Sequence, residues 1–390
     1  MSGEVVVVGA GPVGLLLALE LVRDGVQPVV LEALPQPSNL PKANGIVGRA
    51  VPVLHSRGLY RALTGRRRPR PAPRFMYGGF AVDLRRLRDN PVYVLPVPQR
   101  RLEAVLAERL ASAGVAVRRG HTFSGLSQDS SGVAVTVDGP SGSYSLRCDY
   151  LVGCDGAHSA VRKAAGIGFP GAVDDAVVSR SAHVVLPKGA VSSLTARLRA
   201  PGGPYRPYLF HRTPGGVFSF ARFPGAPHLV TTLEWDASVD DSVPMTVGEL
   251  RASLARVLGA DLAVEPPSGT GPHVLRRAVA RHSRIADSYQ AGRVLLAGDA
   301  AHVVSGIGGP GLNLGILDAV DLAGRLAGGG PLDGYDQARR GPAELVLAHA
   351  AEQSALLGPG AEVEARRSSF AASLATEAGL RRVAEAIAGG

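Results

Sequence analysis

Val5-Val6-Val7-Val8-Gly9-Ala10-Gly11-Pro12-Val13-Gly14 is the stretch that decides the fold of this chain. Four consecutive β-branched residues are typical of a strand that is buried on both faces of a parallel sheet. This strand runs directly into a GxGxxG turn, and residues 15–23 continue with helix formers. Gly25 stands where a left-handed residue would end that helix, before a second apolar strand at residues 26–31. The sequence therefore predicts a βαβ unit.

This βαβ unit has the pattern of a dinucleotide-binding site. Gly9 permits a tight turn, Gly11 lets the backbone approach a pyrophosphate, and Gly14 allows the helix to pack closely on the strand. The N-terminus of the helix would face the phosphates with its partial positive charge. Glu32 follows Gly14 by 18 residues, where a carboxylate accepts hydrogen bonds from ribose hydroxyls. Because it would repel a 2′-phosphate, the pattern favours FAD or NAD(H) over NADP(H); a glycine-rich packing turn is the alternative.

Composition and charge exclude several other classes of protein. The 50 Gly and 29 Pro among 390 residues have no fixed period and accompany 45% apolar residues, so the chain is neither collagen-like nor disordered. Cys148 and Cys154 form no ligand cluster, which argues against a zinc site or a disulfide framework. The net charge of +9 resides between Arg57 and Arg88, where ten Arg accompany one acid. We interpret the run at residues 66–71 as a solvated loop and expect no nucleic-acid binding; a docking patch for an acidic partner or an anionic cofactor is the alternative.

No targeting signal or membrane-spanning segment is expected. The apolar stretch from Val5 to Leu19 follows Glu4 instead of a basic region, is interrupted by three glycines and a proline, and is too short to cross a bilayer. The expected compartment is therefore the cytoplasm, where cysteines stay reduced.

Two further motifs occur far along the chain. Leu151 to Ser159 (LVGCDGAHS) and Arg293 to His302 (RVLLAGDAAH) each combine an apolar strand with a turn. Apolar residues at helical spacing over residues 311–327 predict a helix that begins at a glycine-rich turn, with Pro310 tolerated at its first position. Its N-terminal N–H groups would face whatever that turn holds. Taken alone, the aspartates of the two motifs could be simple helix caps.

Together these three motifs resemble the flavin-dependent aromatic hydroxylases, the single-component monooxygenases typified by para-hydroxybenzoate hydroxylase. The resemblance covers about residues 4–342, and the motifs occur in the order of the family. It is nearest to the actinobacterial members that tailor natural products or modify antibiotics, without a C-terminal thioredoxin-like domain. It implies an α/β fold in which a Rossmann-like FAD-binding domain is interleaved with an antiparallel β-sheet substrate domain and followed by C-terminal helices.

The domains that the resemblance implies can be placed on the chain. The FAD-binding domain is expected to be discontinuous and to comprise residues 1–74, 98–175 and 286–330. Short β-rich runs alternate with Gly/Pro turns in the substrate-binding β-sheet domain, which would comprise residues 176–285 and be joined by residues 75–97. Residues 331–390 are expected to form a C-terminal helical segment.

The resemblance also implies roles for individual residues. Asp299 would bind the ribityl chain of FAD, Gly298 would make room for the cofactor, and Asp155 would contact both FAD and a passing nicotinamide. Lys42 and Gln99 match positions close to the flavin. The complete set of expected FAD-binding residues is Gly9, Gly11, Gly14, Glu32, Lys42, Gln99, Asp155, Gly298, Asp299, Gly309, Gly311, Leu312 and Asn313.

Candidate substrate-pocket residues come from the predicted antiparallel sheet. They are Phe210, His211, Phe220, Arg222 and Trp235, and ordinary core packing is the alternative for each. One segment departs from the family: where relatives commonly read His-x-x-Pro-Pro, residues 302–307 read HVVSGI, and Pro310 replaces a polar residue. Because Ser305 and Gly306 stand where the prolines would, we expect a looser backbone there and altered positioning of the substrate.

The activity implied is that of an FAD-dependent monooxygenase. NAD(P)H would reduce FAD, and O2 would add at C4a to give a hydroperoxide that transfers one oxygen atom to an aromatic or polyketide-like molecule. Hydroxylation is the expected outcome, with epoxidation and Baeyer-Villiger oxidation as alternatives. A flavin-dependent halogenase is set aside because Trp235 is the single tryptophan. An NAD-dependent dehydrogenase and a non-enzymatic FAD-binding protein are the alternatives outside this class. No metal is needed, and both a monomer and a homodimer remain open.

Overall fold

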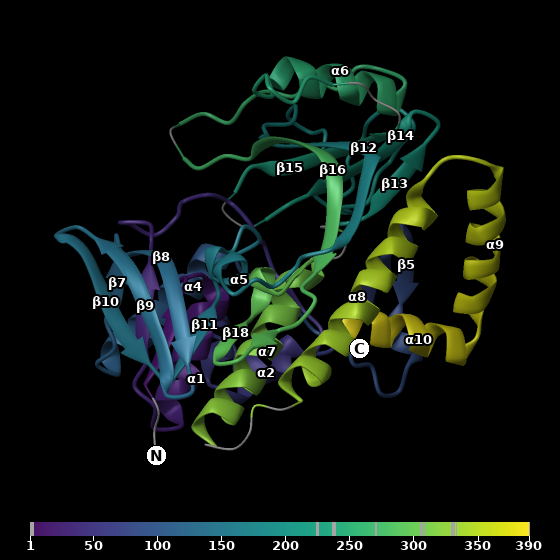
Figure 1. The fold of residues 1–390 in the computed structure, drawn as a ribbon. Helices are drawn as coiled ribbons and strands as arrows, with labels where there is room; N and C mark the ends of the chain where they lie inside the picture. The colour runs from purple at the N-terminus through teal and green to yellow at the C-terminus, as the bar shows by residue number, and fades with distance from the viewer. Residues whose placement is uncertain are drawn as a thin grey trace.

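The computed structural model describes residues 4–223, 226–235, 239–269, 271–304, 307, 309–328, 332 and 334–389. Its first part is organised by a six-stranded sheet with the strand order β17-β18-β11-β1-β2-β7 (Figure 1). Strands β18, β11, β1, β2 and β7 run parallel to one another, and β17 runs antiparallel beside β18. The strands are β1 (Val5–Val8), β2 (Val29–Glu32), β7 (Val117–Arg119), β11 (Tyr150–Gly153), β17 (Gln290–Ala291) and β18 (Val294–Leu296).

The expected βαβ unit is present. Helix α1 (Pro12–Arg23) connects β1 to β2, and every residue of β1 is buried, as a strand covered on both faces requires. Gly25 adopts φ of 87°, and its N–H donates to the carbonyl oxygen of Val22, which ends the helix in the predicted left-handed conformation. The second strand begins at Val29, three residues later than predicted, because residues 26–28 are used to turn the chain back to the sheet.

Four helices pack around this sheet. Helix α1 contacts both α4 (Gln99–Ser112) and α7 (Pro310–Ala327), and α7 contacts α8 (Tyr335–Leu357). The leucines of α1 and the valines of β1 lie in one large hydrophobic core. This core also contains residues of α4, of α7 and of the N-terminal half of α8. The smaller helices of this part are α2 (Ala50–Ser56), α3 (Leu59–Thr64), α5 (Ala160–Ala164) and the 3-10 turn η2 (Gly298–Ala300). A separate antiparallel sheet is formed by β8 (Thr122–Asp129), β9 (Gly132–Gly139) and β10 (Gly142–Cys148).

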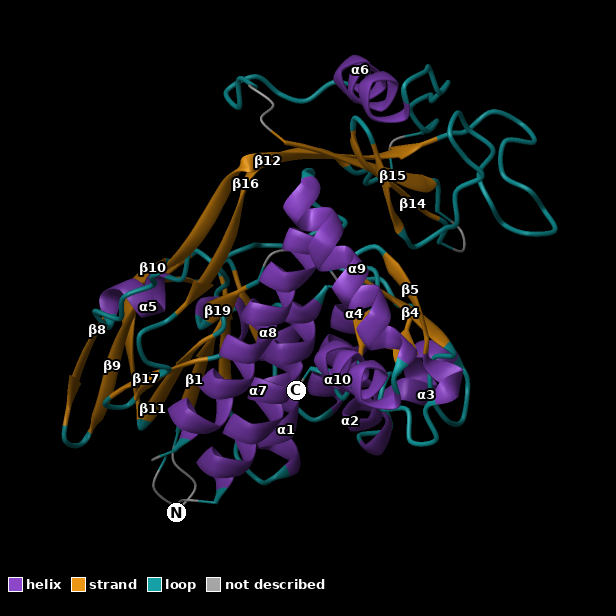
Figure 2. Cartoon of the chain, turned by 90° about the vertical axis from the view of Figure 1, so that its right-hand side faces the viewer, coloured by secondary structure: helices purple, strands orange, loops and turns teal. Residues whose placement is uncertain are grey.

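A second six-stranded sheet stands at the other end of the molecule (Figure 2) and is antiparallel, as expected, although its strands begin at Gly171 and end at Val303, outside the expected residues 176–285. Helix α6 (Val247–Leu258) covers its outer face, where Phe218 and Phe220 are buried. Its strand order is β13-β14-β15-β12-β16-β19. The strands are β12 (Gly171–Val184), β13 (Phe210–Thr213), β14 (Gly216–Ala221), β15 (His228–Trp235), β16 (Leu275–Ile285) and β19 (His302–Val303).

The prediction that residues 75–97 join this sheet is wrong. Instead, β4 (Arg74–Tyr77) pairs with β5 (Phe80–Asp83) in a separate hairpin, which the 3-10 turn η1 (Leu84–Arg86) follows, and β6 (Val94–Leu95) pairs with β3 (Ile46–Val47). Gly78 and Gly79, with φ of 53° and 82°, close the hairpin in a conformation that other residues rarely adopt. The apolar side chains of this hairpin then pack against Phe370 and other residues of the C-terminal helices, which satisfies them without the large sheet.

The C-terminal residues form helices α8, α9 (Ala361–Ala375) and α10 (Glu377–Ala388), which lie beside the β4–β5 hairpin (Figures 1 and 2). The end of α10 reaches back to β3, where the N–H of Arg49 donates to the carbonyl oxygen of Ala388 at 3.0 Å. Gly48 makes this approach possible, since a Cβ there would lie 2.3 Å from the same oxygen. No helix in the described part of the chain is long and apolar enough to cross a membrane.

The arginine-rich run is exposed. Arg66, Arg67, Arg68 and Arg70 lie in the loop between α3 and β4, and all four are exposed to solvent. This agrees with the interpretation of the run as a solvated loop. Both cysteines are free, and the described residues contain no cluster of His, Cys, Asp and Glu that could hold a metal ion.

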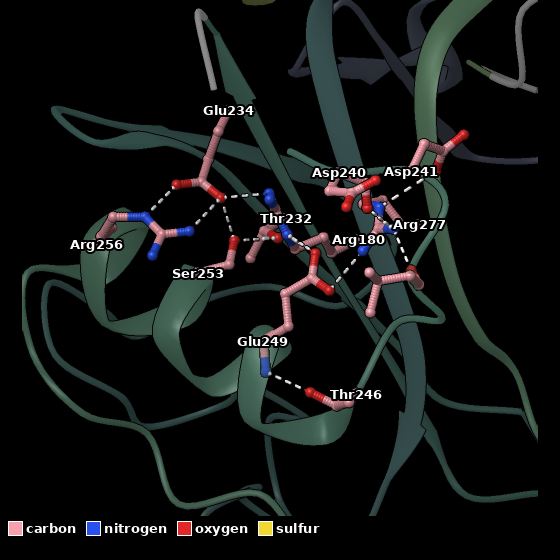
Figure 3. Close-up of polar contacts among 11 residues, drawn as sticks. Arg180, Thr232, Glu234, Asp240, Asp241, Thr246, Glu249, Ser253, Arg256 and Arg277 are labelled. Atoms are coloured by element: carbon pink, nitrogen blue, oxygen red, sulfur yellow. Dashed lines mark hydrogen bonds and ion pairs between the residues drawn. The ribbon is translucent and has the colours of Figure 1, made fainter. Parts of the chain in front are cut away.

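A buried ion network fastens α6 to the outer face of the second sheet (Figure 3). The side chain of Arg180 is 2% exposed and donates to Glu234 and Glu249, both at 2.7 Å. Arg256 and Ser253 of α6 also donate to Glu234. Since each buried charge has a partner of opposite sign, removing one member leaves the others uncompensated.

Replacement of Arg180 by methionine is therefore expected to destabilise the protein. Glu234 would remain buried with only part of its partners, and loss of one partner of a buried pair costs about 3–5 kcal/mol. Urea unfolding measures this loss directly. Arg381→Met is the matched control, because Arg381 and Glu377 form an exposed pair on α10 and their loss should hardly change the unfolding midpoint. Equal midpoints for the two variants would contradict the stabilising role of the network.

Candidate functional site

A cavity of about 740 Å³ lies at the carboxyl ends of the parallel strands. Its walls are the turns that follow β1, β2, β11 and β18, together with α4 and the N-terminus of α7. Ligands of open α/β sheets bind at this edge, and the volume is within the range of small-molecule sites. The cavity brings together ten of the residues expected from the sequence: Gly9, Gly11, Glu32, Lys42, Gln99, Asp155, Asp299, Gly309, Gly311 and Leu312.

The glycines of the first turn serve two purposes. Gly9 has φ of 105°, and a Cβ there would lie 2.4 Å from the carbonyl oxygen of Cys154. A Cβ at Gly14 would lie 2.0 Å from the carbonyl oxygen of Gly9, so this glycine permits the close packing of α1 and does not line the cavity. Gly11 has open space on its Cβ side. Because α1 has no side-chain cap and no acid in its first turn, its N–H groups can receive an anion.

Glu32 is held in a fixed position at the end of β2. Its Oε2 accepts a hydrogen bond from the N–H of Ala10 at 2.7 Å, and its Oε1 accepts one from the N–H of Leu34 at 2.9 Å. A carboxylate has about four acceptor positions, so two remain for hydroxyl donors from the cavity.

Asp155 combines a capping role with a free acceptor. Its Oδ2 accepts from the N–H groups of Ala160 at 2.7 Å and Val161 at 3.2 Å, at the start of α5. Its Oδ1 is buried without a hydrogen-bond partner among the described residues. A buried carboxylate oxygen without a partner is costly, which indicates that a ligand donor completes it. Arg162 ties this turn to the next one by donating to the carbonyl oxygens of Ala157 and Ala300.

Asp299 lies on η2 and is exposed to the cavity. Desolvation by the surrounding protein raises the pKa of Asp299, while His302 and Lys42 oppose the rise. Gly298, with φ of 65°, does not line the cavity; a Cβ there would lie 3.0 Å from Val13, so the missing side chain makes room for α1 and not for a ligand.

Sequence reasoning missed Asp318, the residue that holds the Asp299 turn. Its fully buried carboxylate accepts from the N–H of Gly298 at 3.1 Å, from His302 Nε2 at 2.6 Å and from Arg339 Nε at 2.9 Å. Burial opposes ionisation of Asp318, but His302 and Arg339 outweigh it and lower its pKa. Asp318 lies on the apolar face of the helix predicted at residues 311–327, and a carboxylate at such a position could have indicated a buried structural role.

The glycine turn before α7 forms the last part of the cavity wall. Gly309 has φ of 65° and precedes Pro310, which takes the first helical position as predicted. Asn313 does not line the cavity: its Oδ1 accepts from the N–H of Val47 at 2.8 Å, and its Nδ2 donates to the carbonyl oxygen of Gly309 at 2.9 Å. It therefore joins β3 to the turn. Ser305 and Gly306, where the sequence departs from the family, lie outside the described residues.

Helix α4 forms the opposite wall. Gln99 Nε2 donates to Glu103 Oε1 at 2.8 Å, and both side chains line the cavity near Lys42. Burial raises the pKa of Glu103, while Gln99 and Lys42 oppose the rise. Glu103, Arg119 and His121 were not expected from the sequence; the i,i+4 spacing of Gln99 and Glu103 was the signal for the first of them.

The five candidate substrate-pocket residues do not line this cavity. Phe220 is 1% exposed and packs under α6, as the core alternative proposed. His211 accepts from the N–H of Arg206 at 3.0 Å, burial lowers its pKa, and Arg222 is exposed. Phe210 and Trp235 pack on the inner face of the sheet, in a cluster that includes residues of α8 and the segment before α7.

The fold and the cavity define the class of the flavin-dependent aromatic hydroxylases, and comparison with known proteins agrees. Residues 2–348 match the family described as "FAD binding domain". The chain is 38% identical over 388 residues to a 12-dehydrotetracycline 5-monooxygenase/anhydrotetracycline 6-monooxygenase of Streptomyces rimosus, covering 94% of this chain and 72% of the relative. It is 31% identical over 376 residues to a rifampicin monooxygenase of Rhodococcus hoagii, covering 93% and 73%.

Two solved structures support the same class. An anhydrotetracycline hydroxylase from Streptomyces rimosus matches with a TM-score of 0.82 at 35% identity, covering 100% of this chain and 76% of that one. The p-nitrophenol 4-monooxygenase of Pseudomonas putida matches with a TM-score of 0.78 at 27% identity, covering 100% and 98%. The chain therefore belongs to the FAD binding domain family and is an FAD-dependent monooxygenase.

The residues of the cavity fit FAD. The unpartnered Oδ1 of Asp155 needs a donor, which a cofactor rich in hydroxyl groups supplies. The uncapped N-termini of α1 and α7 suit a pyrophosphate and an electron-rich ring edge. The strands that carry the polar groups stand in the order β18, β11, β1 and β2. At about 4.8 Å per strand, this order spreads Asp299, Asp155, Gly11 and Glu32 along an elongated ligand.

Asp299→Ala is expected to weaken FAD binding by about one to two orders of magnitude, because a charge-assisted hydrogen bond is lost. Fluorescence titration of the apoprotein with FAD measures the change. Asp321→Ala is the control: it removes a carboxylate from the surface of α7 that pairs with Arg325 and should leave FAD affinity unchanged. Unaltered FAD affinity in Asp299→Ala would refute the assigned role.

FAD affinity should also depend on pH through Asp299. An ionised carboxylate accepts from ribityl hydroxyls, so affinity is present above the pKa of Asp299 and falls as the pH drops through it. Because that pKa is raised, the loss should occur at a higher pH than the ordinary aspartate value of about 3.9. FAD titrations across the acid range test this expectation, and Asp299→Asn should lack the inflection. An identical inflection in that variant would assign it to another group.

Proposed function

We propose that this chain hydroxylates a polycyclic aromatic or polyketide-derived molecule, with NAD(P)H as reductant and O2 as the source of the oxygen atom. The observation that carries the proposal is the convergence of three separated turns, at Gly9–Gly14, at Asp155 and at Gly298–Asp299, on one cavity that continues to α7. A dehydrogenase that holds only a nicotinamide dinucleotide would use the first of these turns and would not account for the other two.

Each part of the cavity has a distinct task toward FAD. Glu32 would accept from the adenosine ribose, the N-terminus of α1 would hold the pyrophosphate, and Asp299 would bind the ribityl chain. The remaining cofactor residues proposed from the sequence act beside these, with Gly14, Gly298 and Asn313 shaping the wall from behind. When bound, FAD supplies the chemistry, since it takes hydride from NAD(P)H and delivers oxygen from O2.

The chain itself supplies electrostatic stabilisation at the ring end of the cavity. The first turn of α7 carries no acidic residue and no side-chain cap, and Gly309 and Gly311 leave its N–H groups accessible to the cavity. This partial positive charge stabilises negative charge on whatever ring edge faces it. Asn313 holds the turn in place through its bonds to Val47 and Gly309.

The substrate class rests on the relatives. Two relatives, at 38% and 31% identity, are named as monooxygenases of tetracycline precursors and of rifampicin. Reduced nicotinamides and reduced thiols suit the cytoplasm, and we expect neither nucleic acid nor a membrane as partner.

The test is oxygen transfer by the FAD-loaded protein. NADH and NADPH oxidation would be followed under ¹⁸O₂ with anhydrotetracycline, rifampicin and simple phenols, while peroxide release is measured. Acceleration by one compound, with one ¹⁸O atom incorporated into the product, is expected, and NMR of the product separates hydroxylation from epoxidation and ring insertion. Oxidation of NAD(P)H without oxygen consumption, or a protein that retains no FAD, would contradict the proposal.

A further inference from the structure

The arginine-rich run carries positive charge that the folded protein does not neutralise. Residues 57–74 contain seven Arg and no acid. Arg57 pairs with Glu20, and Asp83, the next acid along the chain, is paired with Arg85. The other six arginines of the run are exposed and form no salt bridge with any residue that the structure describes. They are Arg61, Arg66, Arg67, Arg68, Arg70 and Arg74.

The backbone of this run is anchored although these side chains are unpaired. The carbonyl oxygen of Arg67 lies 3.0 Å from His55 Nε2, next to α2. The N–H of Ala72 donates to the carbonyl oxygen of Val92 at 2.7 Å. The loop therefore displays its guanidinium groups from a fixed position at the surface. Exposed charges without partners attract a ligand over a long range, whereas ion pairs within the protein would cancel that attraction.

The run begins close to the cofactor cavity. Helix α3 packs against both α2 and α4 (Figure 2). In the first turn of α4, Arg101 Nη2 donates to the carbonyl oxygen of Ala62 at 3.4 Å, four residues before Arg66. Gln99 and Arg100 of the same turn line the cavity, and Arg100 is exposed without a salt bridge to a described residue. We use the name arginine face for the six unpaired arginines of the run together with Arg100.

The arginine face offers charge without apolar contact. Residues 57–101 are all described, and no leucine, valine, methionine or aromatic residue among them is exposed. Protein interfaces have an apolar core rich in aromatic residues, and single-stranded nucleic acids stack their bases on exposed aromatic rings. This face suits neither partner. Guanidinium groups match the geometry of phosphate, so a small phosphate-bearing anion fits it better.

The reductant of the reaction is such an anion. NADH and NADPH both carry a negatively charged pyrophosphate, and NADPH carries a further 2′-phosphate. The uncapped N-terminus of α1 suits the pyrophosphate of FAD, so the reductant needs other groups for its own phosphates. We propose that the arginine face attracts the phosphates of NAD(P)H and directs the reductant to the cofactor cavity. The inference rests on the proposed function, in which NAD(P)H reduces the bound FAD.

The test compares two variants of the FAD-loaded protein that lose the same charge. The first carries Arg66→Gln, Arg67→Gln, Arg68→Gln and Arg70→Gln. The control carries Lys188→Gln, Arg197→Gln, Arg199→Gln and Arg206→Gln, which replace four cations between β12 and β13 that form no salt bridge with a described residue. Both variants should retain FAD, because none of these side chains lines the cavity.

Stopped-flow reduction of FAD in the absence of oxygen measures the approach of the reductant. At low ionic strength, we expect the second-order rate constant with NADPH to fall about tenfold in the first variant and to stay unchanged in the control. The fall should be smaller with NADH, which lacks the 2′-phosphate. The rate at saturating NADPH should not change, because steering acts before binding is complete. The difference should disappear at about 1 M salt, where charges are screened within about 3 Å.

Calorimetric titration with NADP+ gives a second measure that involves no turnover. Its affinity should fall in the first variant alone and depend less on salt than in the wild-type protein. Equal losses in the two variants would show an effect of net charge only, and an unchanged first variant would leave an acidic macromolecule as the partner of this face. Either result would overturn the inference and leave the monooxygenase activity intact. If neither nicotinamide binds to the wild-type protein or reduces its FAD, the proposed function fails and this inference fails with it.

Discussion

The packing of the Gly9 turn against the Cys154 turn is the constraint on which the site depends. Strands β1 and β11 pair in parallel from Val5–Tyr150 to Val8–Gly153, and the N–H of Cys154 donates to the carbonyl oxygen of Val8 at 2.8 Å. Any side chain at position 9 would collide with backbone, so only glycine lets both strands end at the same level. Because the strand ends are level, the polar groups that follow them face one continuous cavity.

Buried charged side chains then fix the conformation of the turns around the cavity and in the second sheet. Asp318 gathers the N–H of Gly298, the ring of His302 and the guanidinium of Arg339, which fixes the backbone immediately before Asp299. Arg180 plays the corresponding part in the second sheet, where it joins β12 to β15 and α6. In each network the buried carboxylate finds its partners within the protein, so the binding groups of the cavity remain free to serve a ligand. This division of tasks explains why the cavity keeps a buried oxygen of Asp155 without a protein partner.

The parts that could be predicted from sequence are those fixed by neighbours in the chain. A β-branched run before a GxGxxG turn predicts a strand followed by a helix, and β1 and α1 are formed there. A proline before apolar residues at helical spacing predicts the start of a helix, and α7 begins there. No comparable pattern in the sequence indicates which distant segments of the chain pack against each other. The strands at residues 74–83 have the apolar residues that a sheet strand needs, yet they pack against Phe370, almost 300 residues away. Likewise, alternation places Phe220 and Trp235 on opposite faces of the second sheet without indicating which face α6 covers. Asn313 has the position of a ligand-binding residue, but both polar atoms of its side chain are used within the protein.

The central claim is that three distant turns bind one elongated cofactor together. Hydrogen–deuterium exchange of the apoprotein, titrated with FAD, tests it most directly. The account predicts that exchange slows in residues 9–14, 154–160, 297–300 and 309–314 with a single dependence on FAD concentration. Slowed exchange confined to residues 9–14, with the other turns unaffected at saturating FAD, would contradict it.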